Sequence, residues 1–324
     1  MDIRKPVFCS IEVLYSCILK CKMCHMWKNT RTAEEMSIAD WKKFIVELKE
    51  FIDTATPINI TGGEPLLKED VLDLVRFGVK SGFGSVSMTT NGFLIDTSIA
   101  SAMADSGLSM VSMSLDSLDQ GVHDNIRGLK GACKKVMEAF EYFRNYPGNL
   151  KKLGVQTIIM GPNLGGILDL VKWAHNRNIS IYFMAIAQPL CLSLPGNWHL
   201  ESEYSFLWPN EKTRLFEVID TLVKFKEDGV DIGNSVAQLK AFKTYFTDPN
   251  DFVKKHRQCR MGDGMLKVDP WGNVSLCAEK GAIGNVRVEK IGDLWFSKKA
   301  ADIRESIKTC KTNCPQLVNC FFED

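Results

Sequence analysis

Long hydrophobic runs are missing from this sequence. The longest uninterrupted apolar stretch in its 324 residues lies near Ile181–Ala187, far short of the ~20 residues that span a bilayer. Net charge is also nearly absent, at +1, which gives no support for bulk attraction to nucleic acid or to an acidic membrane. No small-residue cleavage site follows the N-terminal segment, so no signal peptide is expected. We therefore expect a soluble, cytoplasmic globular protein without nucleic-acid or membrane partners.

Cysteine is present in excess. There are eleven cysteines, an odd number in a chain too long to need disulfide staples, so metal binding or redox chemistry is the better interpretation. Three cysteines fall within residues 17–24 and five within residues 259–320, whereas Cys9, Cys133 and Cys191 stand alone. This clustering indicates two functional loops.

Strand-like and helix-like segments alternate up to residue 186. The strands are predicted at 6–14, 57–60, 85–89, 109–115, 154–160 and 180–186. This alternation implies right-handed βαβ units and a parallel sheet that binds ligands at the carboxyl ends of its strands. Periodicity alone leaves an open doubly wound sheet and a barrel as alternatives.

The alternation stops after residue 186. An excursion at 189–209 is expected either to cover the open edge of the sheet or to bury its aromatic residues against helices at 211–227 and 235–247. Asp248-Pro249-Asn250 predicts a turn and a domain boundary. The Cys-rich end is expected to hold little apolar core and to need a metal staple. The predicted parts are 1–186, 187–255 and 256–324.

The first cysteine cluster places Cys17, Cys21 and Cys24 in a loop just after the first strand. Three close thiolates suit a sulfur-loving metal centre. A four-iron cluster held by only three protein thiolates leaves one iron open to another ligand. Zinc, with His25 as the fourth ligand, is the alternative.

A second motif accompanies this loop. The Cys-x3-Cys-x2-Cys loop, followed by Thr61-Gly62-Gly63-Glu64-Pro65 after the second strand, resembles the radical S-adenosylmethionine (radical SAM) enzymes. Met23 departs from the family pattern, in which an aromatic residue often precedes the third cysteine. The resemblance implies a partial (β/α)6 TIM-like barrel with a small C-terminal Cys-rich auxiliary-cluster domain.

The resemblance also implies a set of ligands. Cys17, Cys21 and Cys24 would bind three irons of a [4Fe–4S] cluster, and the fourth iron would chelate S-adenosylmethionine. Gly62, Gly63 and Glu64 would receive the methionine amino group, because glycines allow close approach and a carboxylate accepts charge-assisted hydrogen bonds. Reductive cleavage of S-adenosylmethionine would give a 5′-deoxyadenosyl radical that takes a hydrogen atom from the substrate.

Further cofactor-binding predictions are polar residues near strand ends. Thr90 and Asn91 would reach the methionine or the ribose, with ordinary turn chemistry as the alternative. Ser114 and Asp116 look like the ribose-side groups of the family, although Asp116 would equally suit a helix N-cap. Arg127 is predicted to bind the methionine carboxylate, since a planar fork suits a carboxylate; a surface arginine is the alternative.

The second cysteine cluster is similar to the auxiliary-cluster extensions of radical SAM enzymes, which are called SPASM and, when shortened, twitch. A hairpin at 265–276 fits that unit. We expect one auxiliary [4Fe–4S] cluster, with zinc as the alternative metal. The predicted ligands are Cys259 and Cys277, then Cys310 and Cys314, with Cys320 competing for a place.

We predict a radical SAM oxidoreductase or epimerase that acts on a small molecule: a sugar, an aminocyclitol or a nucleotide-linked metabolite. Cys191 is its candidate catalytic residue, because a thiol beside a substrate radical can return a hydrogen atom. One alternative is a peptide maturase for a ribosomal precursor, for which sixteen residues before Cys17 leave no recognition domain upstream. The other is a zinc-stapled binding protein without catalysis. A flavodoxin or ferredoxin is the expected reducing partner.

Overall fold

The computed structural model describes residues 4–29, 31, 33–188, 196–255, 259–277, 279–312 and 315–319. Its strands are β1 (Phe8–Glu12), β2 (Ile58–Thr61), β3 (Val86–Thr90), β4 (Met110–Ser114), β5 (Lys152–Ile159), β6 (Ser180–Ala185), β7 (Met265–Val268), β8 (Asn273–Ser275) and β9 (Ala282–Asn285). Its helices are α1 (Ile38–Phe51), α2 (Val71–Lys80), α3 (Thr97–Ala104), α4 (Gln120–Arg127), α5 (Ala132–Asn145), α6 (Ile167–His175), α7 (Lys212–Glu227), α8 (Val236–Thr247), α9 (Pro249–Lys255), α10 (Met261–Gly264), α11 (Ile291–Trp295), α12 (Lys298–Lys308) and α13 (Pro315–Asn319).

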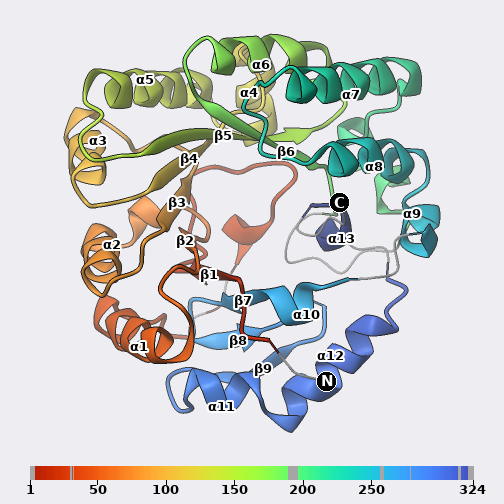
Figure 1. The fold of residues 1–324 in the computed structure, drawn as a ribbon. Helices are drawn as coiled ribbons and strands as arrows, with labels where there is room; N and C mark the ends of the chain where they lie inside the picture. The colour runs from red at the N-terminus through yellow and green to blue at the C-terminus, as the bar shows by residue number, and fades with distance from the viewer. Residues whose placement is uncertain are drawn as a thin grey trace.

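The strands of the described residues form one sheet in the order β6-β5-β4-β3-β2-β1-β7-β8-β9. Strands β1 to β6 pair in parallel, and their connecting helices lie on the outer face of the curved sheet (Figure 1). A right-handed crossover between parallel strands places its helix in this way. The prediction of a partial (β/α)6 barrel is confirmed, and the barrel is not closed.

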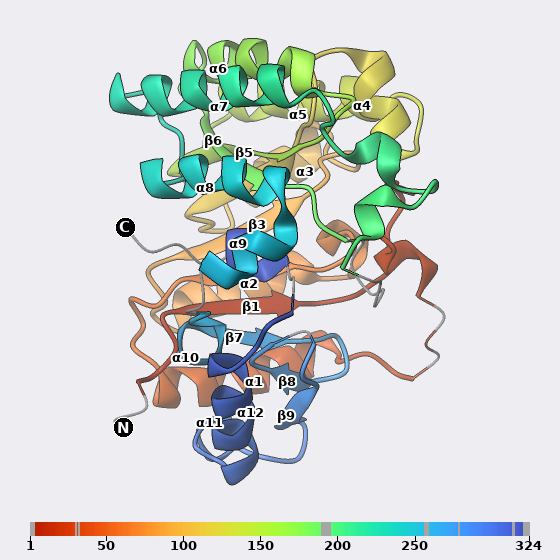
Figure 2. The same cartoon turned by 90° about the vertical axis from the view of Figure 1, so that its right-hand side faces the viewer.

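The C-terminal region continues the same sheet. β7 pairs in parallel with β1, and β8 and β9 follow as antiparallel strands, so the predicted hairpin is confirmed. Figure 2 shows β1 between the barrel strands and this extension. The expectation of little apolar core is wrong, because Leu294 and Trp295 are buried and join the core of the barrel. The extension shares the apolar core of the barrel because Trp295 packs against Phe51 of α1.

The described part of the excursion buries most of its aromatic residues, although Phe206 is 44% exposed. Trp198, Tyr204 and Trp208 are at most 5% exposed, and Trp208 meets Phe246 of α8 edge to face. This is the second of the two predicted arrangements. The predicted turn at Asp248-Pro249-Asn250 is instead the start of α9, where a proline N-terminus loses no hydrogen bond. None of the helices in the described ranges combines the length and hydrophobicity needed to span a membrane.

Helix α4, which the sequence patterns did not predict, packs against the loop that carries Cys17, Cys21 and Cys24. The N–H of Lys22 donates to the carbonyl of Ile126 at 2.9 Å. The helix ends at Gly128, whose φ is +69°, and a Cβ at this position would collide with the carbonyl of Lys20. Gly128 therefore permits both the left-handed turn and the close approach of α4 to the loop.

Gly128→Ala is expected to destabilise the protein more than Gly131→Ala. Gly131 also has a positive φ, +88°, but open space surrounds its Cβ position, so its replacement costs only the left-handed strain of about 1–2 kcal/mol. The collision at Gly128 adds about 1–3 kcal/mol, the usual cost of overpacking. Urea unfolding midpoints of the two variants measure the difference; equal losses would show that the contact with Lys20 carries no strain.

Candidate active site

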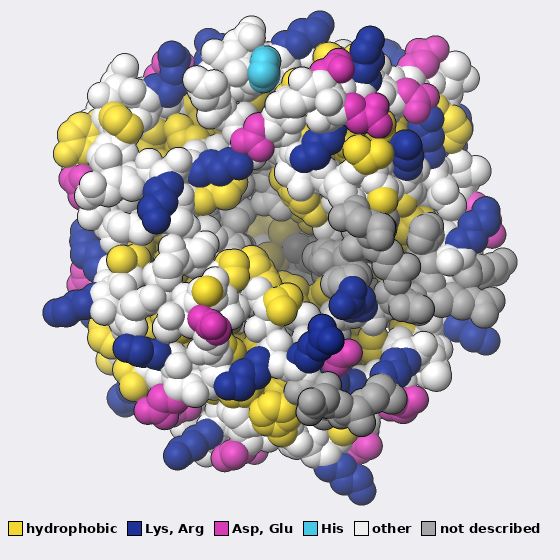
Figure 3. All heavy atoms as spheres, in the orientation of Figure 1, with side chains coloured by type: hydrophobic (Ala, Val, Ile, Leu, Met, Phe, Trp, Pro, Cys, Tyr) yellow, Lys and Arg dark blue, Asp and Glu magenta, His cyan; other side chains and the backbone are white. Residues whose placement is uncertain are grey.

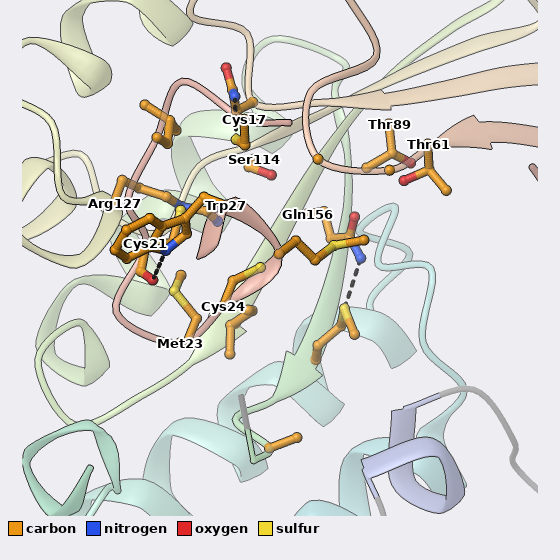
Figure 4. A pocket seen from close by; sticks show the side chains of 18 of the residues that line it. Cys17, Cys21, Met23, Cys24, Trp27, Thr61, Thr89, Ser114, Arg127 and Gln156 are labelled. Atoms are coloured by element: carbon orange, nitrogen blue, oxygen red, sulfur yellow. Dashed lines mark hydrogen bonds between the residues drawn. The ribbon is translucent and has the colours of Figure 1, made fainter. Parts of the chain in front are cut away.

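One cavity of about 250 Å³ opens at the carboxyl ends of the barrel strands. It is lined by nine of the residues predicted to bind cofactors: Cys17, Cys21, Cys24, Gly62, Gly63, Thr90, Asn91, Ser114 and Arg127. Figure 4 shows the cysteines at one end and Thr61 and Thr89 across from them. The barrel thus brings together residues that are far apart in the sequence, as expected for this edge of a parallel sheet.

The three cysteines of the loop are free thiols beside hydrogen-bond donors. The side-chain amide of Asn91 donates to the Sγ of Cys17 at 3.7 Å, and the guanidinium of Arg127 hydrogen-bonds Cys21. Burial raises the pKa of Cys17 to about 11 and also raises that of Cys21, which Arg127 partly offsets. Such donors stabilise a thiolate, so these residues fit an iron–sulfur cluster.

The two glycines after β2 are required by the backbone opposite them. A Cβ on Gly62 would collide with the carbonyl of Leu14, and one on Gly63 with that of Ser16. The N–H of Gly63 donates to Leu14 at 2.8 Å, and the N–H of Glu64 donates to Ser16 at 2.9 Å. The predicted close approach exists, but its partner is the segment that leads into Cys17.

The carboxylate of Glu64 is buried and does not line the cavity in the described structure. It accepts hydrogen bonds from the hydroxyl of Thr90 at 2.7 Å and from the N–H groups of Asn91 at 2.8 Å and Leu66 at 3.1 Å. Burial raises its pKa, and these donors lower it. Glu64 therefore links the ends of β2 and β3 through hydrogen bonds. The backbone of Gly62 and Gly63 faces the cavity.

Arg127 is a buried arginine rather than a surface one. Its Nε donates to Asp116 at 2.7 Å, and Asp116 is completely buried behind it. The second oxygen of Asp116 accepts from the N–H of Ile158 at 3.1 Å. Asp116 thus holds Arg127 in place and is not a helix cap, because Asp119 caps α4 by accepting from Val122.

Thr90 and Asn91 lie where contact with the cofactor would require, and they also make the turn hydrogen bonds that were the alternative. They line the cavity, and their side chains also accept from the N–H groups of Gly92 at 3.1 Å and Phe93 at 2.9 Å. This local turn chemistry holds the two side chains at the cavity wall.

The lining residues that sequence reasoning missed include Gln156, Met184, Gln188 and Asn319. Gln156 and Met184 sit at inward positions of β5 and β6, so the two-residue strand period would have indicated them. The amide of Gln156 donates to the sulfur of Met184 at 2.7 Å. No local pattern marks Asn319, which reaches the cavity from α13.

The second cysteine cluster is partly within the described residues. Burial raises the pKa of Cys259 and of Cys277, and the nearby Cys310 raises both further. All three are half-buried free thiols. Cys191, Cys314 and Cys320 fall outside the described residues.

Family models match both parts of this arrangement. Residues 11–184 match the radical SAM superfamily, and residues 259–316 match SPASM, an iron–sulfur cluster-binding domain. The chain belongs to the radical SAM superfamily. Its two domains imply [4Fe–4S] clusters and S-adenosylmethionine as cofactors, as predicted.

Individual relatives of this radical SAM protein differ in how much of it they match. The PqqA peptide cyclase of Bradyrhizobium diazoefficiens is 26% identical over 322 residues, covering 94% of this chain and 79% of that protein. A probable GTP 3′,8-cyclase of Sulfolobus acidocaldarius is 27% identical over 182 residues. The present chain spans only about half of that protein's length, 56%.

The solved structures show a shared fold. SuiB of Streptococcus suis, bound to its precursor peptide SuiA, has a TM-score of 0.70 at 18% identity. The match covers 97% of this chain and 70% of that chain.

These comparisons correct the predicted function. The prediction of a small-molecule dehydrogenase or epimerase is wrong, because the relative matched over nearly the whole chain is a peptide cyclase and the GTP cyclase matches only about half of it. The prediction that the chain is a radical SAM enzyme is confirmed by the family match.

His123 makes stability depend on pH. Burial lowers its pKa to about 4, Arg127 adds to the effect, and Asp116 and Asp124 oppose it; its Nδ1 accepts from the N–H of Asp116. The unfolded histidine takes up a proton near pH 6.5, so stability is complete above that pH and falls as the pH drops toward 4. His123→Asn keeps an acceptor and removes the titration.

We expect the difference in unfolding free energy between wild type and His123→Asn to shrink by about 2 kcal/mol from pH 7 to pH 5. Anaerobic urea unfolding at several pH values measures it. A difference that stays constant over this range would contradict the neutral, buried state of His123.

Proposed function

We propose that this radical SAM enzyme modifies a residue of a ribosomally made peptide. The observation that carries the proposal is the match to a peptide cyclase along 94% of the chain. The fold shared with SuiB, which was crystallised with a precursor peptide, adds support. The surface view in Figure 3 shows a central hollow with a hydrophobic floor and charged side chains of both signs around it, which suits an extended chain that inserts one side chain.

The proposed division of labour follows the predicted parts. Residues 1–186 form the radical SAM core, 187–255 the cover and connecting helices, and 256–324 the auxiliary-cluster domain. Cys17, Cys21 and Cys24 would hold the first cluster, while Cys259, Cys277 and Cys310 would hold the auxiliary one with Cys314 or Cys320. Bound together, the first cluster and S-adenosylmethionine supply a radical that removes a hydrogen atom from the substrate.

The protein's own groups prepare the site for this chemistry. Asn91 and Arg127 donate to the sulfurs of Cys17 and Cys21, and the backbone of Gly62 and Gly63, which lines the cavity, would receive the amino group of the cofactor. The apolar side chains of Met23, Ile158 and Met184 line the cavity and would keep water from the reacting atoms. A flavodoxin or ferredoxin is proposed as the source of electrons.

Iron content tests the ligand assignment. Anaerobically reconstituted wild type should bind about eight irons per chain, four per cluster. Cys17→Ala should lose about four of these irons, and Cys277→Ala about four others. Cys133→Ala is the matched control, since Cys133 is buried with its thiol against the carbonyl of Ser117 at 3.6 Å. Full iron in either ligand variant, or a loss in the control, would contradict the assignment.

Deuterium transfer tests the substrate class. Wild type reduced with dithionite should move deuterium from uniformly deuterated candidate precursor peptides, encoded beside the gene, into 5′-deoxyadenosine. The Cys17→Ala variant should transfer none. Transfer from deuterated GTP or sugars but not from the peptides would overturn the proposal.

A further inference from the structure

Strand β6 is an edge of the unclosed barrel, yet its edge groups are paired. At one end, the N–H of Ile181 donates to the carbonyl of Asp231 at 3.0 Å, and the carbonyl of Ile181 accepts from Gly233 at 2.8 Å. This is ordinary backbone pairing, an isolated bridge to Ile232. An edge strand without such partners would leave buried N–H and C=O groups unsatisfied.

Two asparagine side chains replace the missing strand further along β6. Asn234 accepts from the N–H of Phe183 at 2.7 Å and donates to its carbonyl at 2.8 Å. Asn319 does the same for Ala185, at 2.8 and 2.9 Å. An asparagine amide has the donor and acceptor of a peptide group, so each side chain mimics one residue of a paired strand.

Asn319 differs from Asn234 in where it comes from. It is the last residue of α13, it is 4% exposed, and it lines the cavity. Its own carbonyl accepts from the hydroxyl of Tyr182 at 2.6 Å and from the amide of Gln238 at 3.3 Å. The end of α13 is thus bound to β6 through both side chain and backbone. In Figure 1, α13 lies beside β6, and the two elements contact each other.

A second contact joins the same two regions. Gln188, which lines the cavity just after β6, donates to Glu279 at 3.4 Å. Glu279 follows Cys277 by two residues, and α13 begins five residues after Cys310. The wall of the cavity and the auxiliary cysteines are therefore connected through the end of β6.

We propose that Asn319 is the positioning residue that fixes the auxiliary-cluster region against the catalytic cavity. The side-chain amide of Asn319, paired with the backbone of Ala185, sets the spacing between the auxiliary-cluster region and the cavity. The same pairing satisfies the edge of β6 at Ala185. On the proposed function, the substrate peptide then enters the cavity from its mouth rather than by adding a strand at this edge.

The chemistry of Asn319 defines two test variants. Asn319→Ala removes both hydrogen bonds to Ala185. Asn319→Asp keeps the shape but loses the donor and sets a carboxylate against the carbonyl of Ala185. Asn234→Ala is the matched control: it breaks the same pair of bonds on the same strand, Asn234 does not line the cavity, and it reaches α13 only indirectly, through the 2.9 Å hydrogen bond that its amide donates to Gln238.

The measurements use the full-length, anaerobically reconstituted protein without peptide. We expect both Asn319 variants to change the EPR spectrum and midpoint potential of the auxiliary cluster and to leave the spectrum of the first cluster unchanged. Hydrogen exchange at the end of β6 and in α13 should accelerate by about tenfold or more, since a buried pair of hydrogen bonds is lost. Asn234→Ala should accelerate exchange near Phe183 and leave both cluster spectra unchanged.

Either of two spectroscopic results would overturn the proposal: an auxiliary spectrum unchanged in both Asn319 variants, or one changed equally by Asn234→Ala. Slow exchange in α13 of the variants would also reject it, because Asn319 would then not hold the helix. None of these measurements involves peptide turnover. Failure of the deuterium-transfer experiment would therefore leave this test intact, and failure here would leave the proposed peptide chemistry intact.

Discussion

The close contact between the turn after β2 and the segment before Cys17 determines the geometry of the site. Gly62 and Gly63 let two stretches of backbone approach until the N–H groups of Gly63 and Glu64 bond to Leu14 and Ser16. Any larger side chain would force the stretches apart. The contact fixes where the cysteine loop leaves the sheet, and with it the end of the cavity that faces the thiols.

The buried carboxylates of Glu64 and Asp116 support this contact from behind the cavity wall. Glu64 joins β2 to β3 through three donors, and Asp116 neutralises Arg127 while accepting from β5. Each carboxylate is buried with its hydrogen bonds satisfied, which is the condition under which a buried charge is tolerated. The carboxylates therefore hold neighbouring elements together by hydrogen bonds. The polar groups that face the cavity are thiols, glycine backbone, hydroxyls, amides and Arg127.

The open edge of the barrel is closed by side chains that come from two later parts of the chain. Asn234 and Asn319 satisfy β6 where a closed barrel would have another strand. This arrangement keeps the cavity accessible and ties the SPASM region to it. An open barrel with a secured edge can admit a larger substrate than a closed one, because strand closure would occupy the same space.

The sequence by itself predicted the strand–helix alternation, because hydrophobic period is a short-range property. Motif spacing and the resemblance to radical SAM enzymes predicted the residues that line the cavity around Cys17, Gly62 and Ser114. Tertiary structure alone decided that Glu64 and Asp116 lie behind the wall and that Asn319 lies in it. These outcomes depend on hydrogen bonds between residues 26 and 134 positions apart. No spacing in the sequence records such pairs, since only the folded sheet brings them within bonding distance.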